Sequence, residues 1–280
     1  MDLNKFMASG INGVMKAVGR YYLSNQKGRA FLARILPQIK RAAKLREQSE
    51  TAGVHVPALL IASVASQCNL RCAGCYAWAG GACREAKAPD LPAGEWARIF
   101  EEASCLGVSF ILLAGGEPLM RRGVVERAGD FPGILFPIFT NATLVDEGYV
   151  RLFSRHRNLI PILSLEGGEA ETDARRGTGV YASVMRSAQL LAREGILFGA
   201  SITATSENLI SVTSDEYADR LREAGFRAVV YVEYVPMDDS TPHLAPGEEQ
   251  RAYMRERLTH LRAQTEMLLI SFPGDELASG

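Results

Sequence analysis

Three cysteines lie close together in the stretch "CNLRCAGCYA", residues 68–77. Cys68, Cys72 and Cys75 follow the spacing C-x3-C-x2-C, and Cys83 comes a little later in the chain. Thiolates bind zinc and iron–sulfur clusters. Three of them on one short loop suit a metal site that keeps one coordination position open, whereas Cys83 as a fourth ligand would complete a structural zinc site. Both alternatives are open at this point.

A disulfide is the less favoured use of these cysteines. No stretch has the pattern of a signal peptide, and no run of apolar residues is long enough to span a membrane. We therefore expect a reducing, cytoplasmic location, where thiols serve metal or redox chemistry more often than disulfides. Cys105 lies in the apolar pattern "ARIFEEASCLGV", and we expect it to be a small buried residue.

Other polar motifs follow apolar runs further along the chain. They are "GGEP" at 115–118, "TNAT" at 140–143, "SLEGG" at 164–168, "SIT" at 201–203 and Glu233. In parallel α/β folds the loops that follow the strands all open on one side, which is where reactive groups gather. We therefore expect these motifs and the cysteines to lie together.

The elements that must position these motifs are short strands and amphipathic helices. With 280 residues and 47% hydrophobic content, the chain can bury a sizeable core. Six apolar runs are continuous instead of alternating, which is typical of strands buried on both faces of a parallel sheet, and helical patterns follow them. The expected strands cover 58–65, 109–115, 134–140, 159–166, 196–203 and 227–235, and the expected helices cover 96–106, 119–128, 146–156, 181–194, 214–224 and 247–264. This alternation indicates an α/β layer fold, either a doubly wound sheet or an incomplete barrel.

Residues 1–57 form a basic region ahead of the first strand. They hold ten Lys or Arg and three acidic residues, while the rest of the chain holds 21 basic and 29 acidic residues. Apolar residues recur at helical spacing around 6–22 and 31–39, which predicts two amphipathic helices. We expect these helices to pack on the acidic body; the alternative is that residues 1–46 contact an anionic membrane surface peripherally. Nucleic-acid binding is not expected, because the basic residues are not interleaved with stacking aromatic residues.

Taken together, C-x3-C-x2-C, "GGEP" and six β/α units resemble the radical S-adenosylmethionine (SAM) superfamily over residues 58–240. "TNAT" and "LSLEGG" followed by "ARRG" look most like its branch with a C-terminal SPASM or twitch extension. The resemblance implies a (β/α)6 partial TIM barrel over 58–271, preceded by the helical extension 1–57. Because no cysteine follows Cys105, we expect that the chain lacks this extension or is truncated before it, with 272–280 as the start of the missing part.

The resemblance also implies roles for individual residues. Cys68, Cys72 and Cys75 would bind three irons of a [4Fe–4S] cluster, and SAM would chelate the fourth iron. The residue before the third cysteine is often aromatic in the family, but here it is Gly74, so Tyr76 is the candidate for that role. The further positions that would contact SAM are Gly115, Gly116, Glu117, Asn141, Ser164, Glu166, Arg176 and Ser201.

The activity implied is reductive cleavage of SAM to a 5′-deoxyadenosyl radical, which abstracts hydrogen from a substrate under anaerobic conditions. The branch is associated with peptide or protein modification and cofactor maturation, and the basic region adds lipid as a substrate class. An electron donor such as flavodoxin or ferredoxin is implied. Glu233 and Tyr234 end the sixth strand, and we expect one of them to face the substrate; residues 166–179 form either a lid or a solvated loop. The rival hypothesis is a non-catalytic protein that binds zinc through Cys68, Cys72, Cys75 and Cys83 and a partner through its basic region.

Overall fold

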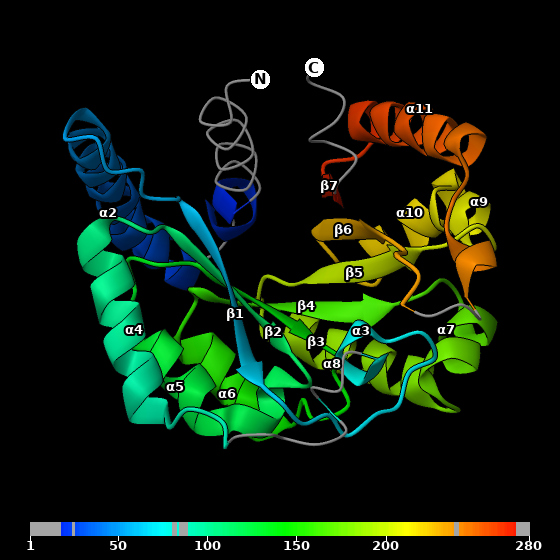
Figure 1. Cartoon of the computed structure of the whole chain (residues 1–280), viewed down its shortest axis with the longest axis horizontal. Coiled ribbons are helices and arrows are strands. Elements are labelled where there is room, and N and C mark those ends of the chain that lie inside the picture. The colour runs from blue at the N-terminus through cyan, green and yellow to red at the C-terminus, as the bar shows by residue number, and fades with distance from the viewer. Residues whose placement is uncertain (1–17, 24–25, 80–82, 84–88, 238–240, 273–280) are drawn as a thin grey trace.

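Seven parallel strands form one curled sheet with helices on its outer face (Figure 1). This computed structural model describes residues 18–23, 26–79, 83, 89–237 and 241–272. Strands that are adjacent in the sheet are consecutive in the chain, which is the order that right-handed β/α crossovers produce. They are β1 (Leu59–Ala65), β2 (Phe110–Gly115), β3 (Phe136–Thr140), β4 (Leu159–Leu165), β5 (Gly199–Ala204), β6 (Ala228–Glu233) and β7 (Leu268–Phe272).

Helices occupy the connections between the strands. The helical patterns of the sequence correspond to α4, the η1–α5 pair, α6, α8, α10 and α11, which confirms each of them. The helices are α2 (Gln26–Thr51), α3 (Tyr76–Ala79), α4 (Ala93–Leu106), η1 (Pro118–Arg121), α5 (Arg122–Gly129), α6 (Glu147–Arg155), α7 (Glu169–Arg176), α8 (Val180–Arg193), α9 (Leu209–Val212), α10 (Asp215–Glu223), η2 (Pro242–Leu244) and α11 (Glu248–Gln264).

The partial-barrel prediction is confirmed, with one strand more than expected. The six predicted strands correspond to β1–β6, and β7 pairs with β6 from Ala228↔Leu268 to Val232↔Phe272. The seventh strand was missed, and it runs one residue past the predicted boundary at 271. Residues 273–280, predicted as the start of an extension, lie outside the described residues.

The outer face of the sheet and one end of its inner face are apolar, and a different set of helices covers each. The larger cluster of buried residues joins the outward-facing strand residues to the helices that follow the strands. A second cluster lies on the inner face, at the end where the strands begin, and contains helical residues from the basic region. Its members are Val18, Tyr22, Phe31, Leu32, Ile35, Phe110, Leu135, Ile160, Ile162 and Leu197. The N-terminal helices thus close the barrel at the end opposite to the strand-to-helix loops.

This packing confirms, for the described residues, that the basic region packs on the body of the protein. The Tyr21 hydroxyl donates to the Ile196 carbonyl at 3.1 Å, and the fully buried Tyr22 donates to the Arg157 carbonyl at 3.3 Å. Farther along α2, the Arg46 guanidinium donates to the Gly107 carbonyl and to Ser109 Oγ. Residues 6–17 of the predicted N-terminal helix lie outside the described residues. None of the described helices has the length and apolar character needed to cross a membrane.

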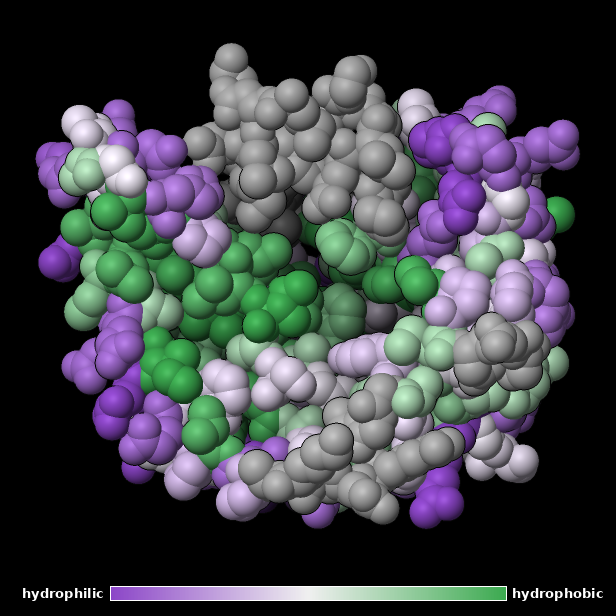
Figure 2. Space-filling view, in the orientation of Figure 1, coloured by the Kyte–Doolittle hydropathy of each residue, from purple (hydrophilic) through white to green (hydrophobic). Residues whose placement is uncertain are grey.

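The curled sheet is open along β1. Among the described strands β1 pairs with β2 alone, and its inward-facing residues Leu59 and Ile61 are 36% and 67% exposed. Figure 2 shows apolar side chains gathered over β1 and the helices beside it. Cys105, at the end of α4, is exposed. The prediction that it is buried was wrong, because α4 directs Phe100 and Ala103 to the core.

Candidate active site

The cysteine loop follows β1 and lies against the loop after β2. The Glu117 amide donates to the Gln67 carbonyl at 2.8 Å, and the Gly116 amide donates to the Ala65 carbonyl at 2.6 Å. A Cβ on Gly116 would lie 2.1 Å from the Gln67 oxygen. Gly115 has φ +117°, which favours glycine. The two glycines therefore allow "GGEP" to approach the backbone that leads into Cys68.

Glu117 is a buried carboxylate at the centre of this contact. Its Oε1 accepts from the Leu119 amide at 2.9 Å and from Thr140 Oγ1 at 2.7 Å, and its Oε2 accepts from the Asn141 amide at 2.8 Å. Burial raises its pKa, and these three hydrogen bonds oppose that effect. A carboxylate has about four acceptor positions, so Oε2 keeps capacity for one more donor.

Asn141 connects the loop after β3 to the first part of the cysteine loop. Its Nδ2 donates to Asn69 Oδ1 at 2.8 Å and lies 3.9 Å from Cys68 Sγ, while its Oδ1 accepts from Thr143 Oγ1 at 2.7 Å. Asn69 in turn donates to Thr143 Oγ1 at 2.8 Å. An amide directed at a thiol is the kind of contact that fixes the position of a metal ligand.

Glu166 and two arginines lie on the other side of the cysteine loop. Glu166 is 1% exposed, and its Oε1 accepts from Arg175 Nη1 at 2.5 Å and from Arg176 Nη2 at 2.6 Å. Its Oε2 is buried and has no hydrogen-bond partner among the described residues. Residues 166–179, predicted as a lid or a loop, contain α7, which carries both arginines.

Ser164 and Ser201 lie side by side on β4 and β5, where the register pairs them. They have the same parity as Ile160, Ile162 and Leu197 of the inner cluster, so they face the inside of the barrel. Ser201 is 8% exposed. The buried acceptor of Glu166 and the two hydroxyls therefore belong to one polar inner surface, as the sequence pattern predicted.

The side chains of the last two candidate residues, Glu233 and Tyr234, point in different directions. Tyr234 is 3% exposed, and its hydroxyl would lie 2.5 Å from a Cβ on Gly74. Glu233 points to the other side, where Arg251 Nη2 of α11 contacts its Oε1 at 2.6 Å. Tyr234 therefore lies against the cysteine loop, while Glu233 is engaged by a helix of the outer layer.

Several residues of this site lie in or near the predicted motifs but were not predicted individually. Thr140, Asn69 and Thr143 hold Glu117 and Asn141, and Asn208 Nδ2 donates to the Glu166 and Thr203 carbonyls, each at 2.9 Å. Thr203 has the parity of Ser201, so alternation along the strand could have placed it on the inner face. Asn208 lies beyond the strand and leaves no comparable signal in the sequence.

The thiols of the cysteine loop are donors of the kind that an iron–sulfur cluster takes. The cysteines of such a cluster bind different irons, whereas a zinc site has its thiolates on one ion. Burial raises the pKa of the Cys68 thiol to about 11 and also raises the pKa of Cys72, where Arg176 opposes the effect. Tyr76, beside the Gly115 backbone, is 58% exposed.

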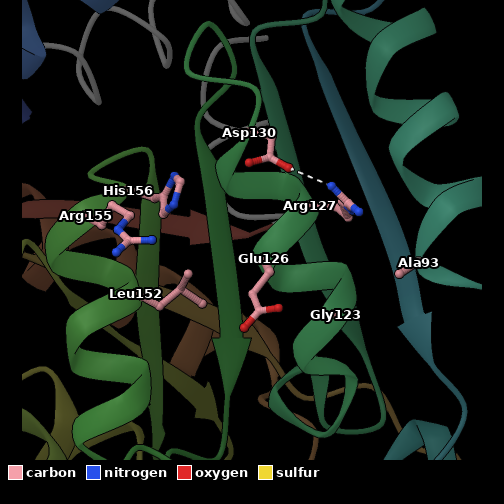
Figure 3. Close-up of a pocket in the computed structure, with 8 residues that line it drawn as sticks. All are labelled: Ala93, Gly123, Glu126, Arg127, Asp130, Leu152, Arg155 and His156. Atoms are coloured by element: carbon pink, nitrogen blue, oxygen red, sulfur yellow. Dashed lines mark hydrogen bonds and ion pairs between the residues drawn. The ribbon is translucent and has the colours of Figure 1, made fainter.

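A separate pocket of about 460 Å³ lies in the outer helical layer (Figure 3). Partners are present for four polar side chains of its lining, which are Glu126, Arg127, Asp130 and His156. His156 Nδ1 is hydrogen-bonded to the Gly129 carbonyl at 2.8 Å, Arg127 pairs with Asp130 at 3.3 Å, and Glu126 pairs with Arg122. This pocket contains no residue of the cysteine loop or of the motifs after β2–β5. The candidate active site is therefore the rim of the barrel and not this pocket.

Comparisons with known proteins agree with this geometry. Residues 63–205 match the family model described as "Radical SAM superfamily". The chain is 26% identical over 202 residues to an AdoMet-dependent heme synthase of Methanosarcina barkeri, covering 70% of this chain and 57% of the relative. It is 26% identical over 209 residues to a serine-type anaerobic sulfatase-maturating enzyme of Klebsiella aerogenes, covering 69% of this chain and 50% of that enzyme.

The fold also resembles that of solved proteins. The structure of Streptococcus suis SuiB bound to S-adenosylmethionine matches 83% of this chain and 54% of that chain, with a TM-score of 0.66 and 18% identity. At 18% identity, this structural similarity is evidence for the fold alone. The chain spans about half the length of the curated relatives described above. The family match covers the cysteine loop and the motifs after β2–β5, and the chain belongs to the radical SAM superfamily.

Proposed function

We propose that this chain is a radical SAM enzyme that binds a [4Fe–4S] cluster through Cys68, Cys72 and Cys75. The observation that carries the proposal is the close approach of the cysteine loop to "GGEP", in which the Glu117 amide donates to the Gln67 carbonyl at 2.8 Å. This contact supports the proposal, because the three-thiol loop lies beside the buried Glu117 carboxylate, a group that suits a cation. A second buried acceptor, Glu166 Oε2, has no hydrogen-bond partner within the described part of the chain.

The cluster, when bound, would supply the electron for reductive cleavage of SAM into methionine and a 5′-deoxyadenosyl radical, the species that would take a hydrogen atom from the substrate. The residues of this chain bind and orient the cofactor. Glu117 Oε2 and the Gly115–Gly116 backbone would receive the SAM ammonium group. Arg176 would receive its carboxylate, and Ser164, Ser201 and Glu166 would receive its ribose hydroxyls. Asn141 would hold Cys68 and the adjacent loop in place.

Tyr234 and the inner barrel surface would face the substrate. Closing this end against water protects a reactive radical from stray hydrogen donors, and the N-terminal helices already close the opposite end. Because Arg251 engages Glu233, we assign the substrate-facing role to Tyr234 and not to Glu233.

The names of the relatives point to several substrate classes. One solved SuiB structure contains its precursor peptide SuiA, and other relatives are named PqqA peptide cyclase and AdoMet-dependent heme synthase. We propose a peptide, a protein or a cofactor precursor as substrate, with lipid as a further class. Electron supply by a flavodoxin or ferredoxin belongs to the proposal, as do a cytoplasmic location, a domain boundary at 57, and peripheral membrane contact through residues 1–46.

The test is anaerobic reconstitution with iron and sulfide, followed by dithionite, SAM and chromatography for 5′-deoxyadenosine. We expect a brown protein that releases 5′-deoxyadenosine, and a Cys75→Ala variant that does not. A colourless wild-type protein that holds one zinc ion and leaves SAM intact would refute the proposal and favour the zinc hypothesis.

A further inference from the structure

The Arg175 side chain extends from α7 to the middle of the cysteine loop. Its Nε donates to the Ala73 carbonyl at 3.1 Å, and the Ala73 amide donates to the Arg175 carbonyl at 2.8 Å. Ala73 directly follows Cys72 and precedes Gly74 and Cys75. Two reciprocal hydrogen bonds therefore fasten the peptide between the second and third cysteines.

The same guanidinium also binds the ends of two strands. Its Nη1 donates to Glu166 Oε1, just after β4, at 2.5 Å and to Thr203 Oγ1 of β5 at 2.8 Å. Its central carbon lies 5.9 Å from the centre of the Tyr234 ring, within the range of a cation–π contact. The Tyr234 hydroxyl end in turn meets Gly74. One side chain thus connects the cysteine loop to the ends of β4, β5 and β6.

The neighbouring arginine is directed differently. Arg176 binds Glu166 Oε1 through Nε at 2.8 Å and through Nη2 at 2.6 Å, so two of its nitrogens serve the carboxylate. Arg175 uses Nε for the loop and Nη1 for Glu166 and Thr203. Only a planar fork of several donors can serve these three acceptors at once, and a lysine ammonium lacks that geometry.

We propose that Arg175 is a positioning residue for the cysteine loop. It holds the segment between Cys72 and Cys75 against the ends of β4 and β5, and so determines where two of the three thiols lie. What those thiols bind rests on the proposed function, but the positioning itself is a property of the chain without any cofactor.

The experiment is hydrogen–deuterium exchange of the cluster-free chain, followed at the amides of residues 71–76. The variants are Arg175→Met, Arg175→Lys and the control Arg151→Met, whose exposed arginine pairs with Glu147 on α6. Loss of one charge-assisted hydrogen bond of about 1.5 kcal/mol corresponds to exchange about tenfold faster. We expect this acceleration in both Arg175 variants, with exchange in β3 unchanged as a check on global stability.

A second readout is the rate at which a chelator removes iron from the reconstituted proteins. We expect faster loss from both Arg175 variants than from wild type and from Arg151→Met. Unchanged loop exchange in Arg175→Met would overturn the proposal, and so would full rescue by Arg175→Lys, because charge alone would then suffice. If wild type binds no cluster but the exchange effect appears, the proposed function fails and the positioning role stands.

Discussion

Replacing Gly74 with alanine tests whether the Tyr234 ring packs against the cysteine loop. Gly74 has φ +64°, so an alanine there costs about 1 kcal/mol in backbone strain. Its Cβ would also lie 2.5 Å from the Tyr234 hydroxyl and 3.1 Å from two ring carbons. Overpacking of this kind costs about 1–3 kcal/mol. We expect Gly74→Ala to lower the free energy of unfolding of the cluster-free chain by about 2–4 kcal/mol, the sum of both effects.

The two contributions can be separated by a double-mutant cycle. Tyr234→Phe alone should raise the free energy of unfolding by up to about 1 kcal/mol, because the buried hydroxyl has no partner among the described residues. In the Gly74→Ala, Tyr234→Phe double variant the closest contact is gone, and the remaining 3.1 Å contacts need only a small shift. Its loss should therefore be about 1 kcal/mol relative to Tyr234→Phe.

Gly53→Ala is the matched control, because Gly53 has φ +80° and an added Cβ there would meet nothing within 4 Å. It should cost about 1 kcal/mol from backbone strain alone. The assay is reversible chemical denaturation of the four variants and wild type. Two results would contradict this packing. Gly74→Ala could lower the free energy of unfolding no more than Gly53→Ala does, or Tyr234→Phe could fail to reduce the loss caused by Gly74→Ala.

Three further perturbations test other parts of the structure. Tyr22→Ala should lower the free energy of unfolding by about 3–5 kcal/mol, because its side chain is fully buried in the inner cluster; a denaturation midpoint equal to that of wild type would contradict this packing. The Tyr181 and Gly179 amides lower the pKa of Asp173 below 3.8, so its contribution to stability is present above that pH and disappears as pH falls through the depressed pKa. The difference in unfolding free energy between wild type and Asp173→Asn should then shrink below pH 3.8, and a difference independent of pH would contradict it. Cys83→Ala should keep the iron content of reconstituted wild type, whereas loss of all metal would favour the zinc hypothesis.

The strands and their order could be predicted because parallel strands buried on both faces leave continuous apolar runs. The seventh strand was missed although it is also apolar. Its segment follows the long charged helix α11 and carries no polar motif after it, so neither periodicity nor a functional signal distinguished it from a tail. Cys105 was misplaced for a different reason: it lies in an apolar stretch but at the exposed end of α4.

The candidate site was predictable where chemistry is carried by a short motif. The cysteine loop and "GGEP" are adjacent, as their positions after neighbouring strands required. Which partner each polar side chain takes could not be predicted, because it depends on contacts between loops. Arg175 and Glu233 show this: the first reaches the cysteine loop, and the second is taken by Arg251 of a helix that follows later in the chain.

The inner cluster has a consequence for the order in which the chain folds. Tyr22 and its neighbours contact residues far along the sequence: the hydrogen bond from Tyr21 to Ile196 spans 175 positions, and that from Tyr22 to Arg157 spans 135. Contacts of such long range form late, because the intervening loop must close first. During synthesis the residues of this helical segment therefore emerge long before the strands they cover. Until β4 and the residues just before β5 have been made, Ile160, Ile162 and Leu197 are missing from the inner cluster, and the growing chain leaves part of its apolar surface exposed.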